Sequence, residues 1–328
     1  MINKLQIYIA DSTDPYYNLA TEKLFLDSVD TGCCILYLWQ NKNTVVIGRN
    51  QNPWAECRIS AIKEEDVHLA RRLSGGGAVF HDLGNLNFTF IMKEEDYDLT
   101  KQQKVIQTAC GYAGIQAEIS GRNDILANGR KFSGNAFYHS RGNAYHHGTL
   151  LIDTDAEKLG RYLTPPKAKL EAKGVTSVRS RVVNLRELSE KLTCKQMVQY
   201  MCDAFSQVYG LSAEFIELSE DDEQKIQQGA AEFADENWLY GSTPSFSFSC
   251  ERHFQWGYFS LLLQVKKNTV TAAKVYTDSM DWCVAESVEY ALLGKAFDIQ
   301  ILCLSIQGSS LEESIRNDLQ QLIQEQLI

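Results

Sequence analysis

Residues 71–92 read RRLSGGGAVFHDLGNLNFTFIM, which joins two arginines, three consecutive glycines and a run of alternating apolar and polar residues. Three successive glycines remove the Cβ atoms from one wall of a loop, so neighbouring backbone N–H groups can converge on an anion. Arg71 and Arg72 can add forked, charge-assisted hydrogen bonds to that anion. The alternation from Leu86 to Ile91 is typical of a half-buried strand. This stretch predicts a sheet with an anion-binding loop ahead of one strand.

The glycine run also has a simpler explanation. A flexible turn with solvated arginines would account for it without any ligand. A P-loop does not fit, because no Lys-Ser or Lys-Thr follows at the required spacing. A dinucleotide fingerprint fails as well, because Phe80 stands where its third glycine belongs. Other parts of the chain have to decide between a turn and an anion site.

Helix and strand patterns alternate on both sides of this stretch. Spacing and propensity predict helices at 18–29, 54–65, 101–112, 155–163 and 195–209. Alternation predicts strands at 34–39, 44–48, 86–91, 117–119, 132–138 and 149–152. We expect the first two strands to form a hairpin across the polar turn 40–43. Because no strict strand-helix-strand repeat is present, the order favours an α+β fold with a mixed or antiparallel sheet flanked by helices.

The chain of 328 residues exceeds the usual size of one core and predicts two domains. The segment 214–236 carries nine acidic residues and the single base Lys225, and it leads into Gly241-Ser242-Thr243-Pro244. Such a change in composition is typical of a domain boundary. Beyond it we expect strands at 253–265 and 269–276 around a turn at 266–268, and helices at 286–296 and 311–323. The prediction is a large catalytic domain, 1–243, and a small α+β accessory domain, 244–328.

Composition excludes several classes of protein. Hydrophobic residues make up 44% of the chain and charged residues 23%, which excludes wholesale disorder. The formal net charge of −10 argues against nucleic acid as a partner. Nine cysteines without a CxxC pair argue against a disulfide framework or a zinc ribbon, and no apolar run approaches the ~18 residues that span a bilayer. We expect a cytoplasmic protein with no membrane partner.

A second glycine-rich cluster runs from Gly121-Arg122-Asn123-Asp124-Ile125 to Gly129-Arg130-Lys131-Phe132-Ser133-Gly134-Asn135-Ala136. Lys131 stands near the start of a strand, where it can project into a cleft while the glycines admit a ligand close to the backbone. Without those neighbours it would be an ordinary surface charge. Asp124 has the hard oxygen ligand that suits Mg²⁺, although an Asp before a turn is commonly a cap.

Two further clusters complete the pattern. In the segment 145–151, YHHGTLL, the adjacent His146 and His147 should point to opposite faces of a strand, so one can face a pocket but both cannot easily bind one metal. From Arg161 to Arg186 there are seven basic residues against the single acid Glu171. Small residues between these charges suit a loop that closes over an anionic ligand, although a solvated hairpin would look similar.

These four clusters, taken in this order, resemble the lipoate-protein ligase A family. The strings RRLSGGGAVFHDLGN, GRNDI, GRKFSGNA and HHGTLL carry the resemblance, which extends into the C-terminal region around residues 273–279. The resemblance implies a catalytic domain shared in fold with biotin-protein ligases and a small accessory domain. It also implies a two-step reaction, in which lipoate and MgATP give lipoyl-AMP and pyrophosphate. The lipoyl group then passes to a lysine of an apo lipoyl domain, in 2-oxoacid dehydrogenase E2 subunits or the glycine cleavage H protein.

The resemblance also assigns roles to residues. Lys131 matches the family lysine that contacts both the lipoyl carboxyl oxygen and the phosphate, and Asp124 is our metal-side residue. ATP-binding positions are implied at Lys131 and at Arg72, Gly75, Gly76, Gly77, Ala78, Val79, Phe80, Gly174, Val175, Ser177 and Arg179. Lipoate contacts are expected at Lys131 and at Leu73, Ser74, His81, Gly134, Ala136 and His147, with Val79 as a further wall residue. The charges suit this chemistry, because activation brings two anions together and requires cations and backbone donors where charge accumulates.

Two alternatives stay open on the sequence alone. An octanoyl or lipoyl acyltransferase of the same superfamily would move acyl groups between carrier domains through a nucleophilic cysteine. Cys33, Cys57 and Cys110 lie outside the glycine and lysine clusters, so the sequence offers no obvious site for a cysteine nucleophile. A protein that binds acyl-adenylates or lipoyl domains without turnover is the second alternative.

Overall fold

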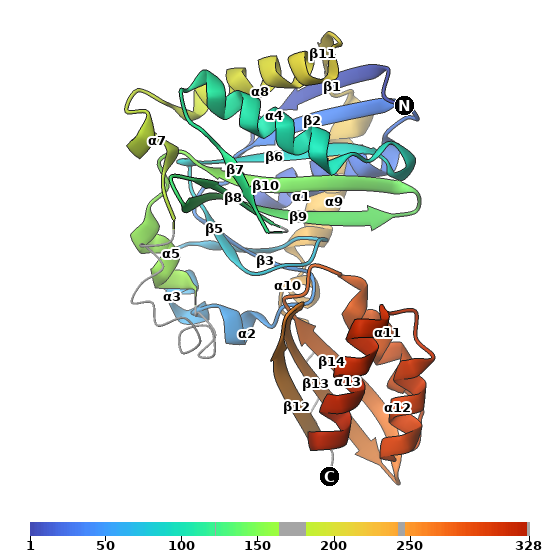
Figure 1. The fold of residues 1–328 in the computed structure, drawn as a ribbon. Helices are drawn as coiled ribbons and strands as arrows, with labels where there is room; N and C mark the ends of the chain where they lie inside the picture. Colours follow the sequence, from blue (N-terminus) through green and yellow to red (C-terminus); the bar gives the residue numbers. More distant parts are fainter. Residues whose placement is uncertain (122, 164–181, 242–246, 327–328) are drawn as a thin grey trace. The chain divides into compact units, whose positions relative to one another are not determined.

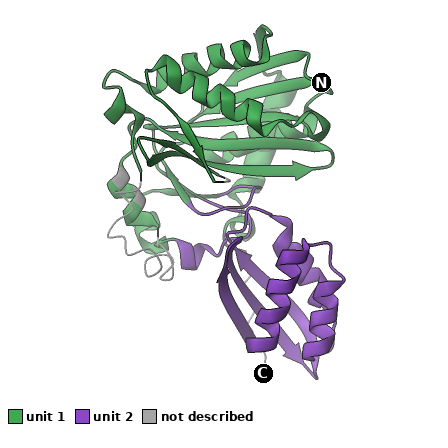
Figure 2. Ribbon diagram, in the orientation of Figure 1, with its two compact units in different colours: residues 1–46, 57–70, 79–239 green, residues 47–56, 71–78, 240–328 purple. Residues whose placement is uncertain are grey.

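The computed structural model describes residues 1–121, 123–163, 182–241 and 247–326. The chain forms two compact units, shown in green and purple in Figure 2. The first comprises residues 1–46, 57–70 and 79–239, and the second comprises residues 47–56, 71–78 and 240–328. Two short segments of the N-terminal half therefore belong to the same unit as the C-terminal region. The predicted division into 1–243 and 244–328 stays a prediction.

An eight-stranded mixed sheet forms the centre of the first unit (Figure 1), with the spatial order β11-β1-β2-β6-β10-β9-β8-β7. β1 pairs in parallel with β2 and with β11, and the other neighbours are antiparallel. The strands are β1 (Lys4–Ile9), β2 (Cys33–Trp39), β6 (Asn85–Lys93), β7 (Glu118–Ser120), β8 (Asp124–Ala127), β9 (Arg130–Ser140), β10 (Asn143–Leu151) and β11 (Ala213–Phe215). The predicted α+β fold class with a mixed sheet is confirmed.

Helices cover both faces of this sheet (Figure 1). α4 (Leu99–Tyr112) and α8 (Cys194–Tyr209) lie together on one face, and α1 (Pro15–Ser28) and α9 (Glu220–Ala234) on the other. α1 begins after Asp14, whose side chain accepts hydrogen bonds from the Tyr16 and Tyr17 N–H groups, a cap that stabilises a helix by about 1 kcal/mol. The core under α4 and α8 includes Phe88, Phe90 and Phe205, and each buried aromatic ring of this kind contributes roughly 1.5–3 kcal/mol.

The hairpin predicted between residues 34–39 and 44–48 is wrong. β3 (Thr44–Ile47) follows β2 in sequence but belongs to a separate three-stranded sheet of order β4-β3-β5, with β4 (His68–Arg71) and β5 (Val79–His81). β2 is flanked on one side by β1 and on the other by β6. Because both of its edges are occupied, no position next to β2 is available for β3.

The prediction that the strand at 86–91 is half-buried is also wrong. Every residue of β6 from Asn85 to Met92 is buried, including the polar Asn87 and Thr89. The face that carries these polar side chains is covered by α1, and both side chains find hydrogen-bond partners there. Alternation in this strand therefore separates an apolar core from a buried polar layer, and neither face meets solvent.

The other elements up to Tyr240 match the predictions only in part. The helix expected at 54–65 is divided into α2 (Pro53–Glu56) and α3 (Ile59–Glu64), because Cys57 forms a β-bridge with Leu163. The strand expected at 149–152 is the end of the longer β10, and β1, β4, β5, β8, β11 and α9 were not predicted. Three further short helices lie in the described part of this region: α5 (Ala156–Tyr162), and α7 (Leu185–Leu188) and α10 (Glu236–Tyr240), which were not predicted. α10 ends at Tyr240, where the C-terminal portion of the second unit begins.

The second unit contains a three-stranded antiparallel sheet, β12 (Phe248–Phe254), β13 (Gly257–Lys266) and β14 (Thr269–Thr277). Lys267 and Asn268 connect β13 to β14 with φ values of 48° and 59°, so the predicted turn is confirmed and is left-handed at both positions. The helices of its C-terminal portion are α11 (Cys283–Leu292), α12 (Ile299–Gln307), which was not predicted, and α13 (Glu313–Gln326). Among the described residues, no helix has the length and apolar composition needed to cross a lipid bilayer.

Candidate functional site

Lys131 and Asp124 lie on the neighbouring strands β9 and β8, and the structure brings them together. The distance from Lys131 Nζ to Asp124 Oδ1 is 2.7 Å, and the two side chains are 38% and 44% exposed. A pair with this much exposure contributes little to stability. It is accessible to a ligand, and it places one cation and one hard oxygen ligand side by side.

A β-bulge puts Lys131 on the same face as Asp124. Asp124 pairs with Gly134 and Ile125 with Ser133, but the next residue, Leu126, pairs with Lys131, so Phe132 is the extra residue of β9. Phe132 and Ser133 are both fully buried. With two consecutive side chains directed inward, Lys131 and Gly134 share the outer face, which regular alternation would forbid.

Gly134 is required by the position of the lysine side chain. A Cβ atom on Gly134 would lie 3.1 Å from Lys131 Nζ and 3.2 Å from its Cε. The Gly134 N–H donates to Thr149 Oγ1 at 3.2 Å, which ties this part of β9 to β10. Ala136, predicted to contact lipoate, is buried and pairs with His147 across the same two strands. Lys131, Asp124, Gly134, Ala136 and His147 therefore belong to one continuous region of the sheet.

The backbone of Lys131 also pairs with residues 182 and 183 of the basic segment 161–186, the predicted anion-binding loop. Val182 forms a parallel bridge with Lys131, and the Val183 N–H donates to the Lys131 carbonyl oxygen at 2.9 Å. The predicted nucleotide contacts of this loop lie outside the described residues: Gly174, Val175, Ser177 and Arg179. Val182 and Val183 of this segment thus lie immediately beside the lysine.

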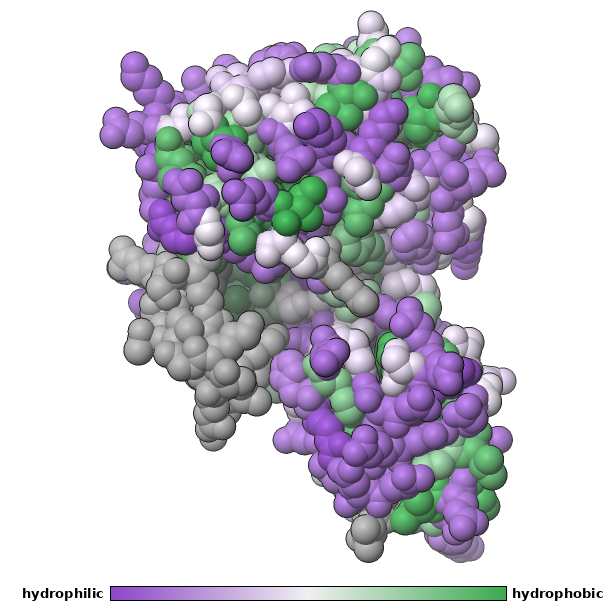
Figure 3. All heavy atoms as spheres, in the orientation of Figure 1, coloured by the Kyte–Doolittle hydropathy of each residue, from purple (hydrophilic) through white to green (hydrophobic). Residues whose placement is uncertain are grey.

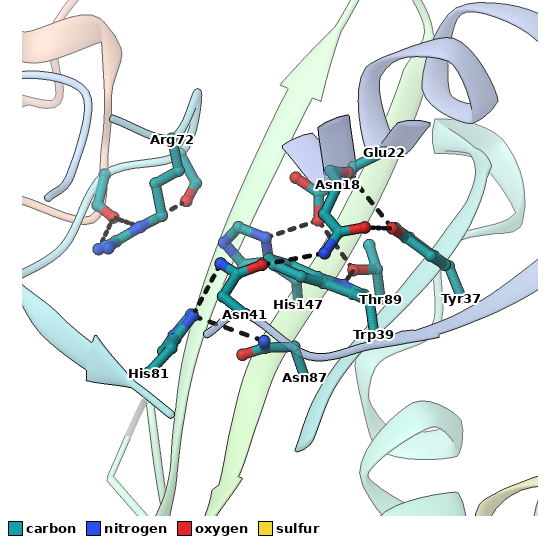
Figure 4. Close-up of polar contacts among 12 residues, drawn as sticks. Asn18, Glu22, Tyr37, Trp39, Asn41, Arg72, His81, Asn87, Thr89 and His147 are labelled. Atoms are coloured by element: carbon teal, nitrogen blue, oxygen red, sulfur yellow. Dashed lines mark hydrogen bonds and ion pairs between the residues drawn. The ribbon is translucent and has the colours of Figure 1, made fainter. Parts of the chain in front are cut away.

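The glycine loop 74–77 belongs to the second unit. The Arg72 guanidinium donates to the carbonyl oxygens of Gly75 and Gly77 at 2.7 and 2.8 Å, and Arg72 Nε donates to Ser74 Oγ at 3.1 Å. Figure 4 shows the Arg72 side chain folded back in this way. The arginine predicted to bind phosphate therefore braces the loop from within in this structure.

Two positions of this loop require glycine, Gly75 because of a close backbone contact and Gly76 because of its backbone conformation. A Cβ atom on Gly75 would lie 2.2 Å from the Ser279 carbonyl oxygen, and the Gly76 N–H donates to the same oxygen at 3.1 Å. Gly76 also has φ 89°, a value that favours glycine. Gly77 is exposed, and nothing lies within 4 Å of its Cβ position. The triple glycine thus combines two structural positions with one open position.

The other predicted residues around this loop divide between the two units. Leu73 and Ala78 are half-buried in the second unit, and Ser74 is buried there. Val79 and Phe80 begin β5 in the first unit, where Phe80 pairs with Val45 and its ring packs against Tyr162. The Phe80 side chain is therefore a core residue, and only its backbone is suited to a nucleotide.

The two adjacent histidines point to opposite faces of β10, as predicted. His147 Nδ1 lies 2.8 Å from Glu22 Oε1 on α1, and both side chains are buried. His146 is fully buried on the other face, between Gln102 Oε1 at 2.9 Å and Asn135 Oδ1 at 2.8 Å. Burial lowers the pKa of His146 to about 3, so this imidazole is neutral.

A buried polar cluster surrounds His147 and His81 (Figure 4). The Thr89 hydroxyl donates to Glu22 Oε1 at 2.8 Å and accepts from Trp39 Nε1 at 3.1 Å. His81 Nδ1 faces two amide groups, Nδ2 of Asn41 at 3.3 Å and Nδ2 of Asn87 at 3.5 Å, and therefore acts as an acceptor. Both predicted lipoate-contact histidines are thus oriented by neighbours from several elements.

Glu22, Trp39 and Thr89 of this cluster were missed from the sequence. Glu22 lies in a helix whose composition gives no sign that a carboxylate is buried. The available signal was the pair of polar residues at alternate positions of β6. They mark a polar face of the strand, but alternation alone does not show whether that face is exposed to solvent or covered by another element.

A cavity of about 620 Å³ lies in the second unit between α11 and α12, lined by Tyr290, Lys295 and Leu304 among others. Figure 3 shows apolar side chains gathered on the surface around α12, where Ile301 and Leu304 are 41% and 71% exposed. None of the residues predicted for nucleotide or lipoate binding lines this cavity. The predicted chemistry is therefore not located there.

Comparison with known proteins defines the family. Residues 14–206 match the family described as Lipoyl protein ligase A/B catalytic domain, and residues 243–327 match Bacterial lipoate protein ligase C-terminus. The chain is 40% identical over 321 residues to Lipoate-protein ligase A of Bdellovibrio bacteriovorus, and the match covers 95% of each chain. The chain belongs to the lipoate-protein ligase family.

Solved structures of lipoate ligases share the fold. LipL1 of P. falciparum, solved in complex with lipoate, is 25% identical and covers 98% of this chain and 100% of its own, with a TM-score of 0.85. A bi-partite lipoate protein ligase from Thermoplasma acidophilum, described together with its E2 lipoyl domain, is 24% identical. It covers 76% of this chain and 100% of its own, with a TM-score of 0.66. The expected enzyme class, a ligase, is confirmed by the family match.

The cysteines of this lipoate-ligase family member do not favour the acyltransferase alternative. All nine are free. Burial raises the pKa of the Cys34 and Cys110 thiols well above the usual range, and burial also raises the pKa of Cys194 to about 11. A nucleophilic thiol needs the opposite shift, toward the thiolate. The lysine site is therefore better suited to the chemistry than these three cysteines.

Proposed function

We propose that this ligase activates lipoate with ATP to lipoyl-AMP and then transfers the lipoyl group to a lysine of an apo lipoyl domain. The observation that carries the proposal is the accessible Lys131–Asp124 pair, placed on one face by the bulge at Phe132. In the first step a lipoate carboxylate oxygen attacks the α-phosphorus, and the bond to pyrophosphate breaks. In the second step the acceptor amine attacks the lipoyl carbonyl carbon, and AMP leaves.

Lys131 supplies the fixed positive charge that the first step requires. Carboxylate and phosphate repel each other, and the charge on the reacting oxygens has to be balanced as they approach. The Lys131 ammonium group is oriented before the substrates bind, because it contacts Asp124 at 2.7 Å and lies over Gly134. The lysine bridges the reactants electrostatically and forms no covalent bond to either.

Asp124 would hold Mg²⁺ with the phosphates of the nucleotide. The described residues contain no group of three or more His, Cys, Asp or Glu side chains that could hold a metal by themselves. This fits Mg²⁺, which commonly takes one or two carboxylates and completes its shell with phosphate oxygens and water. The bound cation would neutralise phosphate charge. The half-exposed Asp124 carboxylate is the donor that this chain supplies.

The nucleotide would be bound by Arg72 and by the backbone from Gly75 to Phe80, with Gly174, Val175, Ser177 and Arg179 contributing from the basic loop. The exposed Gly77 supports this assignment, since its open Cβ position leaves room for a phosphate beside the backbone. The bridge between Val182 and Lys131 supports a loop that ends at the reacting groups.

Lipoate would contact Lys131 and Gly134 with its carboxylate end, and Leu73, Ser74, His81, Ala136 and His147 would line the site, with Val79 as a further wall residue. The Glu22–His147 contact at 2.8 Å and the amide groups around His81 support fixed orientations for both histidines. A wall fixed in this way can select an acyl chain by its shape, although one methylene changes affinity by only about 1–3 kcal/mol.

The acceptors we propose are apo lipoyl domains of 2-oxoacid dehydrogenase E2 subunits and the glycine cleavage H protein, in the cytoplasm. The free cysteines support a reducing compartment. We also propose that residues 1–243 form the catalytic domain and residues 244–328 the accessory domain. The acidic balance of the whole chain does not oppose an anionic substrate, because the segment 161–186 carries a local positive excess.

One assay tests the function and the role of Lys131 together. The protein, lipoate, MgATP and an apo lipoyl domain are combined, and the acceptor is weighed by mass spectrometry while pyrophosphate release is followed. We expect lipoate-dependent pyrophosphate release and a heavier acceptor. Lys131→Ala should lower adenylate formation by about 10²–10³-fold, the loss typical of removing one transition-state charge partner.

Arg130→Ala is the matched control, because Arg130 is adjacent, 38% exposed and paired with Glu187 at 3.1 Å. It should keep adenylate formation within about two-fold of the wild-type rate. Full activity in Lys131→Ala would remove the lysine from the mechanism. Acceptor modification without ATP would replace the ligase reaction by acyl transfer.

A further inference from the structure

Asn135 holds the turn that leads into Asp124. Its backbone N–H donates to the Asn123 carbonyl oxygen at 2.8 Å, and its side-chain Nδ2 donates to the same oxygen at 2.9 Å. A carbonyl oxygen has two lone pairs, and both are used here. Asn135 is only 8% exposed, so water does not compete freely for these bonds. The peptide group immediately before Asp124 is thus fixed by one residue of β9.

The fixed peptide group restricts the backbone from which the Asp124 side chain projects. Asp124 begins β8 and pairs with Gly134, which directly precedes Asn135 in sequence. Its carboxylate reaches Lys131 Nζ across this pairing. The side chain is 44% exposed and would have several rotamers available in a free strand end. The clamp on Asn123 removes the backbone freedom that would otherwise add to this spread.

His146 in turn fixes the amide of Asn135. Because Asn135 Nδ2 is committed to Asn123, Oδ1 faces His146 Nε2 at 2.8 Å and requires a donor there. A neutral imidazole with its proton on Nε2 meets this need and leaves Nδ1 as an acceptor. In this structure Gln102 Oε1 lies 2.9 Å from that nitrogen, and Gln102 Nε2 donates to Met92 Sδ at 3.3 Å. A half turn of the Gln102 amide would exchange its oxygen and nitrogen and place the NH₂ group against Nδ1. A relay of hydrogen bonds therefore runs from His146 on β10 through Asn135 to the Asn123 carbonyl group before Asp124.

The surroundings of His146 make this relay rigid. The rings of Phe88, Phe90 and Phe137 lie 5.3, 5.9 and 5.0 Å from the imidazole, centroid to centroid. His146 itself has no exposed surface. A ring enclosed in this way can neither rotate nor exchange its partners for water, so the orientation of the Asn135 amide is defined by the core.

We propose that Asn135 and His146 are positioning residues of the ligase reaction, which hold Asp124 against Lys131 through the Asn123 carbonyl group. Neither residue touches a substrate in this scheme. The proposal rests on the proposed function only in giving Lys131 and Asp124 their catalytic roles. The geometric part concerns the Lys131–Asp124 contact itself and can be measured without turnover.

The first test compares two buried asparagines. Asn135→Ala removes the amide that clamps Asn123, whereas Asn143→Ala removes an equally buried amide, whose Nδ2 donates to the Leu26 carbonyl oxygen at 2.7 Å. We expect Asn135→Ala to lower kcat for adenylate formation at least ten-fold while KM for lipoate changes less than two-fold. Asn143→Ala should keep kcat within two-fold at a similar loss of melting temperature. Equal effects of the two variants on kcat would overturn the proposal.

The relay through His146 is tested by a conservative pair. His146→Gln retains an amide donor that can reach Asn135 Oδ1, and His146→Leu fills similar space without one. We expect His146→Gln to stay within about three-fold of the wild-type kcat and His146→Leu to match Asn135→Ala. Equal activity of the two His146 variants would remove His146 from the relay and leave Asn135 as the only positioning residue.

The closing measurement does not depend on activity. The acylation rate of Lys131 by an amine-reactive anhydride is followed by peptide mass spectrometry in the folded full chain. Loss of the Asp124 contact frees the amine, so Asn135→Ala should raise the rate at least three-fold and Asn143→Ala should not. In an Asp124→Asn background, Asn135→Ala should add nothing further. An unchanged acylation rate in Asn135→Ala would contradict the proposal that Asn135 holds Asp124 against Lys131. An active Lys131→Ala enzyme would contradict only the catalytic role of Lys131.

Discussion

Gly75 and Gly134 both belong to glycine-rich segments that stand out in the sequence, but different atoms occupy the space beside them. A Cβ atom on Gly75 would lie 2.2 Å from the Ser279 carbonyl oxygen, a backbone atom of another part of the second unit. A Cβ atom on Gly134 would meet the end of the Lys131 side chain at 3.1 Å. A backbone atom cannot move aside at low cost, whereas a flexible side chain can. The first glycine therefore serves packing, and the second serves the position of a reactive group.

The largest effect should come from Gly75→Ala. The added methyl group overlaps backbone atoms of Ser279 and Met280, so we expect a loss of about 3 kcal/mol in unfolding free energy, the upper end for overpacking. Urea denaturation of the full chain measures it. A loss below about 1 kcal/mol would mean that the glycine loop can leave Ser279 easily, and the contrast with Gly134 would disappear.

A smaller effect should come from pH, through the core that supports the Lys131 region. Burial lowers the pKa of His146 to about 3 from the usual 6.5, so the unfolded chain binds its proton first. Stability from this group is complete above pH 6.5 and falls as pH drops toward 3. Between pH 7 and pH 5 the loss should be about 2 kcal/mol. Urea denaturation at both values measures it, and His146→Gln should lack this share of the pH dependence.

Gly134→Ala should separate activity from stability. The methyl group displaces the Lys131 ammonium from its place beside Asp124, so we expect about a ten-fold slower adenylate formation, which corresponds to about 1.4 kcal/mol. Unfolding free energy should change by less than about 0.5 kcal/mol, because the displaced atoms are the end of a half-exposed side chain. A large loss of stability with normal kinetics per folded molecule would reverse the interpretation of this glycine.

The smallest effect should come from Gly77→Ala, the control within the triple glycine. No atom lies within 4 Å of its Cβ position, and the residue is exposed. We expect the unfolding free energy to stay within about 0.5 kcal/mol of the wild-type value. Thermal denaturation beside Gly75→Ala gives the comparison directly. A substantial loss would show that the open space at Gly77 is filled in solution.

Much of the local structure could be predicted, because it depends on neighbours in sequence. The opposite directions of His146 and His147 follow from the two-residue period of a strand, and the turn at Lys267-Asn268 follows from its residue types. The family strings also named Lys131 and Asp124 as candidate residues, and the structure places them 2.7 Å apart. The period alone could not place them on one face, since that depends on the extra residue Phe132.

Errors arose wherever a distant partner decided the outcome. The polar residues of β6 were expected to face solvent, yet α1 covers them and Glu22 accepts a hydrogen bond from Thr89. The two strands after α1 were expected to pair, yet the edges of β2 are occupied by β1 and β6. In each case the sequence pattern was interpreted correctly as a strand, and the neighbour was wrong.

The sequence by itself determined the fold class, the family and the residues that carry the charges, because composition, periodicity and short motifs are local properties of the chain. Tertiary structure alone decided what those residues touch. It placed Ser279 against Gly75, Glu22 against His147 and Asn135 behind Asp124. The physical reason is that close packing and buried hydrogen bonds are satisfied between segments far apart in sequence, and local patterns do not specify which segments meet.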